Sequence, residues 1–227
     1  MSGYQVEGGM AHLTLDHGKV NALGSAALGW LHESLDQALA DGAAAVILTG
    51  REGVLCAGFD LKELQSDPAT RESLRRGLID LELRLFEFEL PVVIACTGHA
   101  MAAGAALLLS ADRRIGLNGD FKIGFNEAKM GVAISAATVE LARYRMPMPW
   151  FESLIAGETY LPTTAVPAGL LDMVVDDVTA LAGEALAAAA ALSQINSHTF
   201  KDMRRVTRGA TADRIRLERA RLWPDAE

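Results

Sequence analysis

The chain has 227 residues, of which 50% are hydrophobic and 22% are charged. This composition is typical of a folded globular protein and excludes a disordered or collagen-like chain, and the length predicts one domain with at most a small appendage. The formal net charge is −8. A bulk negative charge disfavours general binding to nucleic acid or to an anionic membrane, so we expect neither partner.

The cysteines, the histidines and the N-terminus bear on location and metal content. Cys56 and Cys96 have neither a metal-ligand spacing nor the pattern of a disulfide framework, and no two histidines stand four residues apart. The first residues lack the basic segment and apolar run of a secretory signal. We therefore expect a reduced, cytoplasmic protein without a metal site.

The first third of the chain predicts alternating strands and helices. Residues 11–15 suit a short strand, and leucines spaced by three and four residues between 28 and 39 form one stripe of a helix. Residues 45–49 are apolar on both faces, as in a strand of a parallel sheet. A glycine-rich loop is expected over residues 50–60.

The middle of the chain continues this alternation. Residues 70–88 predict an amphipathic helix, and residues 114–117 predict a strand. Residues 90–109 carry no formal charge and are long enough to cross a bilayer. Because a β-branched run over 92–96 is followed by Thr97-Gly98-His99, we interpret the segment as a buried strand, a turn and a buried helix.

The last third is mostly helical from about residue 140. Seven arginines lie between residues 204 and 221. Such a run is usually a solvated helix face, while an anion-binding or subunit-contact role is the alternative. Strands that alternate with connecting helices predict an α/β fold.

Several common catalytic motifs are absent from the sequence. There is no glycine-rich dinucleotide or P-loop phosphate motif and no G-x-S-x-G nucleophile elbow. Cys56 is a conceivable nucleophile, but a small buried thiol beside Ala57-Gly58 is the favoured interpretation.

Two turns rich in glycine and alanine each follow an apolar strand, at residues 57–59 and 98–104. The second turn opens a helix, whose first N–H groups have no intrahelical acceptor. Two such N–H groups at one carbonyl oxygen would form an oxyanion hole made of main chain. The small residues are equally consistent with tight packing between strand and helix.

Glu127 is a lone carboxylate between the short apolar stretch around Phe125 and the run over residues 130–134. Apolar surroundings would raise its pKa toward the working range of a general base. A surface carboxylate at a helix N-terminus is the alternative, and taken alone it is the favoured one.

Together these segments resemble the crotonase family, also called the enoyl-CoA hydratase/isomerase superfamily. The resemblance runs from about residue 10 to residue 176 and depends on the order and spacing of several motifs. The motifs are Lys19-Val20-Asn21-Ala22-Leu23; residues 46–50 followed by 56–64; residues 91–95 followed by 98–112; and Gly157-Glu158-Thr159, Ala165 and residues 169–172. Each motif alone is weak, whereas the ordered set is specific.

The resemblance implies a crotonase-like spiral of ββα repeats, with residues 1–176 as the core. Residues 177–227 are expected to form a helical trimerisation region, shortened relative to many members. A homotrimer or a dimer of trimers is the implied assembly.

The resemblance also implies a substrate and a set of site residues. Members of the family form the enolate of an acyl-CoA thioester, and by residue-by-residue match the backbone N–H groups of Phe59 and Ala103 would hold the thioester oxygen. Coenzyme A belongs to the substrate, so neither a metal nor a redox cofactor is implied. The matched substrate-binding positions are Lys19, Ala22, Ala57, Gly58 and Lys62.

The carboxylates indicate the reaction. Hydratases of the family use two glutamates, and here the first position is Ala106 while the second matches Glu127. Residues 123–127 also resemble the corresponding stretch of the Δ3,Δ2-enoyl-CoA isomerases, which use one glutamate. The sequence thus predicts an enoyl-CoA isomerase; hydration, thioester hydrolysis, decarboxylation and a non-catalytic acyl-CoA binder stay open. His99 is expected to pack locally.

Overall fold

A computed structural model describes residues 2–224, the side chain of residue 155 apart. One of its two sheets has six strands in the order β1-β2-β3-β5-β7-β10, parallel except for the β1–β2 pair. Its strands are β1 (Gly3–Glu7), β2 (Met10–Thr14), β3 (Ala45–Thr49), β5 (Val92–Cys96), β7 (Arg113–Leu117) and β10 (Met173–Val175).

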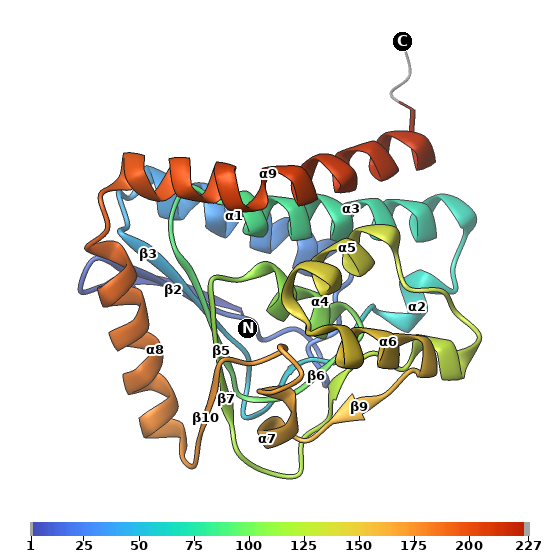
Figure 1. Cartoon of the computed structure of the whole chain (residues 1–227), viewed down its shortest axis with the longest axis horizontal. Coiled ribbons are helices and arrows are strands. Elements are labelled where there is room, and N and C mark those ends of the chain that lie inside the picture. Colours follow the sequence, from blue (N-terminus) through green and yellow to red (C-terminus); the bar gives the residue numbers. More distant parts are fainter. Residues whose placement is uncertain (1, 225–227) are drawn as a thin grey trace.

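A smaller sheet has the order β4-β6-β8-β9. Its strands are β4 (Gly53–Cys56), β6 (Gly98–Met101), β8 (Ile123–Gly124) and β9 (Thr159–Tyr160). Successive strands alternate between the sheets: β3 precedes β4, β5 precedes β6, and β7 precedes β8. Helices follow these strand pairs, so the chain climbs as the expected spiral of ββα repeats (Figure 1).

The helices surround the sheets. They are α1 (Ser25–Ala40), α2 (Leu61–Leu64), α3 (Pro68–Glu87), α4 (Ala103–Ser110), the 3₁₀ helix η1 (Glu127–Met130), α5 (Ala136–Arg145), α6 (Met148–Ala156), α7 (Pro162–Ala165), α8 (Val178–Ser193) and α9 (Ser197–Leu222). Helix α8 covers one face of the large sheet, and the principal core lies on the other. Burial on both faces explains the continuous apolar run of β3.

The structure differs from the sequence expectations mainly at short strands. Strand β1 was not predicted, and the expected loop and turn contain β4 and β6. A Cβ at Gly98 would lie 2.0 Å from the carbonyl carbon of Gly53. The two strands therefore approach so closely that glycine is required, and this composition looks like a turn when only sequence is considered.

Residues 90–109 contain β5 and nearly all of buried α4, as expected, with β6 where the turn was expected. Within the described residues, no single helix has the length and apolarity to cross a membrane. Helices α8 and α9, bent at 98° to each other, pass that test only when joined, on length and composition alone.

Helix α9 lies along α3 and α5 (Figure 1). Its arginines were expected to form a solvated face, and this is wrong for several of them. Arg204 and Arg208 are 7% exposed and bind the two oxygens of Asp112 at 2.6 and 2.7 Å. Further along the helix, Arg214, Arg216 and Arg219 pair with Glu140, Glu87 and Asp80. These ion pairs hold α9 against other helices and loops of the same chain.

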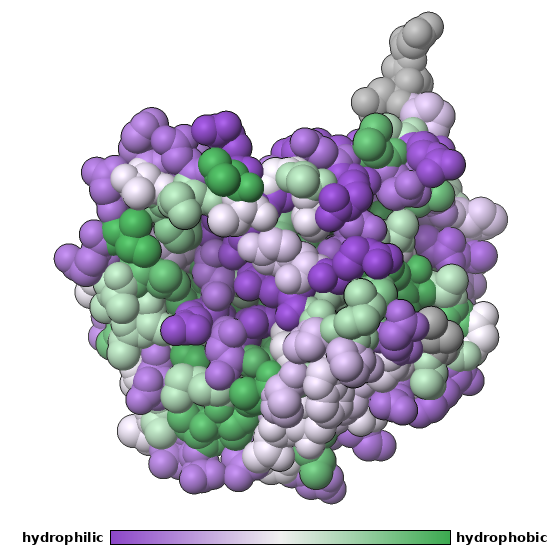
Figure 2. Space-filling model, in the orientation of Figure 1, coloured by the Kyte–Doolittle hydropathy of each residue, from purple (hydrophilic) through white to green (hydrophobic). Residues whose placement is uncertain are grey.

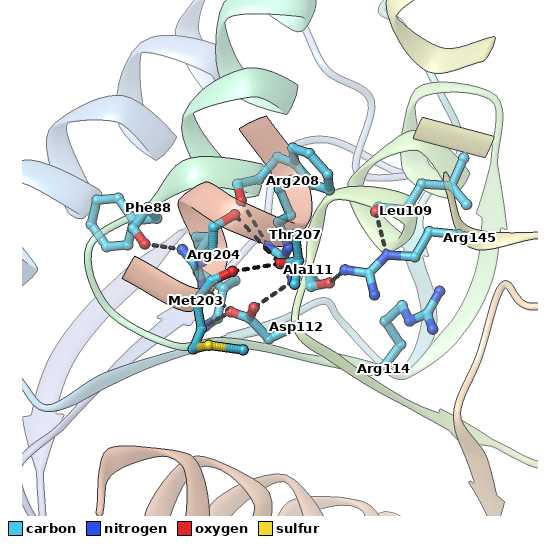
Figure 3. A network of polar contacts seen from close by, with 12 residues as sticks. Phe88, Leu109, Ala111, Asp112, Arg114, Arg145, Met203, Arg204, Thr207 and Arg208 are labelled. Atoms are coloured by element: carbon cyan, nitrogen blue, oxygen red, sulfur yellow. Dashed lines mark hydrogen bonds and ion pairs between the residues drawn. The ribbon is translucent and has the colours of Figure 1, made fainter. Parts of the chain in front are cut away.

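Figure 3 shows how this network holds the end of α4. Arg145 donates to the carbonyl oxygens of Leu109, at 3.1 Å, and Ala111. Arginines suit the C-terminus of a helix, where carbonyl groups lack partners and the dipole is negative. The C-terminus of α4 is thus fixed from the outside, while its N-terminus faces the cavity described below.

Candidate active site

A cavity of about 920 Å³ opens where the two glycine- and alanine-rich segments meet. We call it the candidate cavity. Its walls come from the loop before α2, helices α2 and α3, the β6–α4 junction, the segment from β8 to α5 and the end of α9. Of the predicted site residues, Ala22, Ala57, Gly58, Phe59, Lys62, Ala103 and Glu127 line it.

The two predicted oxyanion segments are in contact. A Cβ at Gly58 would lie 3.1 Å from the Cβ of Ala102 and 3.9 Å from the main-chain nitrogen of Ala103. Gly58 has φ +108°, a conformation that side chains rarely adopt. Both space and conformation therefore require glycine where the first segment approaches the second.

Ala102 precedes α4 with φ +53°. A non-glycine residue in this region is strained, and such strain persists only where the surroundings impose it. The N–H of Ala102 donates to the carbonyl of Gly124 at 3.0 Å, which ties this junction to β8. The strained junction sits at the start of α4, where the predicted donor Ala103 begins the helix.

Both predicted donor N–H groups lack an acceptor within residues 2–224. The neighbours of Phe59 are engaged on one side: the Gly58 carbonyl accepts from Leu23 at 2.8 Å, and Asp60 N–H donates to Leu23 at 3.0 Å. Neither the Phe59 N–H, in the loop before α2, nor the Ala103 N–H, at the N-terminus of α4, has a hydrogen-bond partner among these residues. Their role as an oxyanion hole stays a prediction.

Asn21 holds the first segment, and the sequence did not single out this role. Its buried side chain donates to the carbonyls of Leu15 at 2.7 Å and Leu55 at 3.2 Å, and its oxygen accepts from His17 N–H at 2.9 Å. Its φ of +50° is a conformation that asparagine tolerates better than most residues. One side chain thus joins the end of β2 to β4.

Glu127 begins η1, with two residues between it and the end of β8, and lines the candidate cavity. Its side chain is half-buried, and Oε2 is shielded from solvent without a partner in the described part of the chain. Loss of solvation raises the pKa of this carboxyl above its ordinary value, against smaller opposing effects of main-chain hydrogen bonds. Glu127 does begin a helix, as that alternative has it, but it is half-buried in the wall of the candidate cavity, and its role as a base stays a prediction.

A family model described as enoyl-CoA hydratase/isomerase matches residues 5–221. The chain belongs to this family. A solved enoyl-CoA hydratase/isomerase family protein from Pseudomonas syringae is 39% identical and has a TM-score of 0.93, over 97% of this chain and 95% of that one. The predicted crotonase-like fold is confirmed.

Curated relatives in the family have different names. The probable enoyl-CoA hydratase of Bacillus subtilis is 29% identical over 86% of this chain and 76% of its own length. Human mitochondrial enoyl-CoA delta isomerase 1 is 31% identical over 77% of this chain and 59% of its own length. The chain is thus an enzyme of the enoyl-CoA hydratase/isomerase family, and family membership alone does not distinguish the two reactions.

Ala106 is the second residue that bears on the reaction in this family. It is 1% exposed and lines the candidate cavity one turn into α4. No carboxylate stands at this position, where the sequence comparison placed the first glutamate of the hydratases. Another carboxylate at the cavity, Asp60, caps α2 by accepting from Lys62 N–H at 2.8 Å.

Lys19 is the exception among the predicted substrate contacts. It lies in the turn before α1, its carbonyl oxygen accepts from Arg51, and it does not line the candidate cavity. Two cations that the sequence interpretation missed do line it, namely Arg71 and Arg75 on α3. Their four-residue spacing on one helix face was the available signal.

Two residues with alternative interpretations turn out to be structural. Nδ1 of His99 accepts from the N–H of Lys122 at 2.9 Å, and its ring meets Phe121 edge-on, which confirms local packing. Cys56 is fully buried, and burial raises the pKa of its thiol to about 12. A thiol in that state is a poor nucleophile, so the structural interpretation of Cys56 holds.

Proposed function

We propose that this enzyme is an enoyl-CoA isomerase that moves a double bond from C3 of an acyl-CoA thioester to C2. One observation carries the proposal: among the described residues, Glu127 places a buried carboxylate oxygen without a partner in the cavity that Ala106 also lines. Adding water requires a group that deprotonates the water and preferably a second that supplies the α-proton. Moving a double bond requires only one base.

In this mechanism Glu127 removes a proton from C2 of the 3-enoyl thioester. The electrons of that C–H bond form the dienolate, whose negative charge rests on the thioester oxygen. The carboxylic acid formed at Glu127 then returns the proton to C4, which leaves the double bond between C2 and C3. One residue serves both transfers because the product of the first step is the acid of the second.

The N–H groups of Phe59 and Ala103 would stabilise the dienolate. Neither has an acceptor within residues 2–224, and the positive end of the α4 dipole adds to the second. One donor of this type contributes about 2.7–4 kcal/mol to the transition state, so two provide a large part of the rate enhancement. Main-chain donors do not depend on the side chain, which is why alanine at 103 is compatible with this role.

The cations at the candidate cavity suit the coenzyme A part of the substrate. Lys62, Arg71 and Arg75 lie with the predicted backbone contacts at Ala22, Ala57 and Gly58. Phosphate groups favour arginine and lysine side chains, while the apolar wall suits an acyl chain. We propose that the phosphates bind at these cations.

The test is an isomerase assay on a panel of 3-enoyl-CoA esters, in which the conjugated 2-enoyl product is followed. We expect Glu127→Gln to lower kcat about 10³-fold, within the usual range for a general base, while acyl-CoA binding persists. Glu72→Gln is the matched control, since Glu72 lines the cavity but pairs with Arg75 at 3.8 Å. Equal activity of the wild type and Glu127→Gln would refute the assignment.

Product mass separates the alternatives. Hydration adds one water, whereas isomerisation leaves the mass unchanged, and hydrolysis releases free coenzyme A. A wild type that binds the whole panel without converting it would favour a non-catalytic acyl-CoA binder.

Three further expectations from the sequence stay proposals: a homotrimer or dimer of trimers built through residues 177–227, a cytoplasmic location, and a reaction without metal or redox cofactor. Residues 225–227 of that region lie outside the described residues.

A further inference from the structure

A fully buried carboxyl group stands beside the candidate cavity and has no part in the proposed reaction. Glu82 on α3 is 0% exposed. It follows Leu78 and Ile79, which line the cavity, by four and three residues, so the three side chains share one face of the helix. Its Oε2 is buried without a partner in the described part of the chain.

Oε1 of the same carboxyl has one partner. The hydroxyl of Thr138, at the start of α5, donates to it at 2.5 Å. Thr138 Oγ1 also lies 2.8 Å from Oγ of Ser135, and both Ser135 and Thr138 line the cavity. The three side chains form a polar strip, Glu82–Thr138–Ser135, in a wall otherwise made by residues such as Leu78, Phe125 and Ile134.

Helix capping explains only part of this strip. Ser135 is the N-cap of α5, and its Oγ accepts the Thr138 N–H at 3.0 Å, which is ordinary capping. A cap does not require an acid behind it. Burying a carboxyl with one unsatisfied oxygen destabilises the folded state, so this acid calls for another explanation.

Glu82 fixes the direction of the neighbouring hydroxyl proton. Because Thr138 donates to Glu82, its oxygen can only accept on the cavity side. Ser135 O–H in turn donates to Thr138 Oγ1 at 2.8 Å, so both hydroxyl protons are engaged. Each of the two oxygens keeps one lone pair that can accept, which matches a ligand hydroxyl acting as a donor.

We propose that the Glu82–Thr138–Ser135 strip is a subsite for a hydroxyl group on the acyl chain, so that hydroxylated acyl-CoA thioesters are a preferred substrate class. Glu82 acts in it as a positioning residue, and Ser135 and Thr138 make the contacts. This inference rests on the proposed function insofar as the cavity takes acyl-CoA esters. A ketone, which only accepts, fits the strip less well than a hydroxyl.

Binding of saturated thioesters tests the subsite without any turnover. The probes are octanoyl-CoA and its derivatives with one hydroxyl, one for each carbon beyond the reacting carbons, measured by calorimetry. We expect at least one derivative to bind the wild type about five- to tenfold more tightly than octanoyl-CoA, as for one well-made hydrogen bond. The ratio is the dissociation constant of octanoyl-CoA divided by that of the hydroxylated derivative. It should fall to about one in Thr138→Val.

Other variants distinguish positioning from mere stability. Ser135→Gly, which retains most of the capping, should also reduce the ratio. Glu82→Gln keeps an oxygen that can accept from Thr138 and should retain the ratio, whereas Glu82→Leu should lose it. Thr97→Val is the matched control, because Thr97 is buried outside the cavity.

The outcomes separate this inference from the proposed function. Wild-type protein that binds octanoyl-CoA with every hydroxylated derivative equal or weaker overturns the subsite alone. An equal effect of Thr97→Val and Thr138→Val on the ratio would also overturn it. Failure to bind any thioester would instead count against the acyl-CoA cavity itself. If Glu82→Leu does not fold, Thr138→Val and Ser135→Gly still decide.

Discussion

In the candidate cavity, Oε2 of Glu127 and Nε1 of Trp223 are buried without a hydrogen-bond partner in the described part of the chain. Around Asp112 the opposite holds, since both carboxylate oxygens bind arginines of α9 (Figure 3). Those arginines also donate to the carbonyls of Phe86 and Phe88. The residues around Asp112 are the more deeply buried, yet it is the shielded atoms of the cavity that lack partners.

The difference teaches how to distinguish a structural charge cluster from a site. Buried polar groups are nearly always hydrogen-bonded, so an unsatisfied one requires an explanation such as a ligand. Seven arginines in a run look more functional in the sequence than one glutamate. In the structure, the arginine cluster is internally complete and the glutamate is not.

The outer face of α9 supports this distinction. Hydrophilic side chains gather on the surface over this helix, with apolar ones scattered among them (Figure 2). Exposed Arg205 pairs with Asp202, one turn away, at 3.5 Å. Such surface pairs contribute little to stability, so the inner arginines, rather than the whole run, should hold the helix.

The largest effect is expected from breaking the satisfied network. Asp112→Asn removes the charge that pairs with Arg204 and Arg208, and leaves two buried cations without a counter-ion. We expect the free energy of unfolding to fall by about 3–5 kcal/mol, as measured by urea denaturation. Asp202→Asn should change it by less than about 0.5 kcal/mol. Equal effects of the two variants would contradict the distinction between the inner and outer arginines.

A second change alters the geometry of the cavity without touching a charge. A Cβ at Gly104 would lie 2.2 Å from the Cys56 carbonyl oxygen, so Gly104→Ala must push α4 away from β4. We expect kcat to fall about 10²-fold, because the Ala103 N–H moves with the helix. In Gly183→Ala the new Cβ meets nothing within 4 Å, and that variant should be more stable by about 0.5–1 kcal/mol with unchanged kcat. An active Gly104→Ala would argue against a fixed oxyanion hole.

The buried acid Glu82 should make stability depend on pH. Burial raises the pKa of Glu82 from 4.5 to about 8, with the hydrogen bond from Thr138 opposing the shift. Between these values the folded protein holds a proton that the unfolded chain releases, so stability falls as pH rises from about 5 to 8. Glu82→Gln should flatten this decline. Between about pH 5 and pH 8 the variant should lose less of its free energy of unfolding than the wild type, by roughly a few kcal/mol. An identical slope in wild type and variant would show that Glu82 is charged in the folded state.

The smallest expected effect is a displacement of a pH profile. The carboxylate form of Glu127 is the base, so kcat/KM should be lost as pH falls through its pKa. Because loss of solvation raises that pKa, the acid limb should lie above the ordinary glutamate value of about 4.3. Measurement of kcat/KM between about pH 4 and 8 locates it. A limb at or below the ordinary value would mean that Glu127 is better solvated than the structure indicates.

Local patterns predicted much of the fold. Helix α1, strands β3 and β5, and helix α3 follow from apolar spacing, since that spacing matches the face each element buries. Strands β4 and β6 were missed because close approach of their backbones requires glycine at 98, and glycine indicates a turn when only neighbours along the chain are considered.

The sequence by itself determined the family, through motifs in a fixed order, and it identified Glu127 and Ala106 as the pair that indicates the reaction. Only the tertiary structure decided that Glu127 is desolvated, that Arg71 and Arg75 reach the cavity while Lys19 does not, and that Glu82 meets Thr138 from 56 residues away. The physical reason is the same in each case. Solvation and hydrogen bonding depend on atoms that are close in space, and for these residues the atoms come from distant parts of the chain.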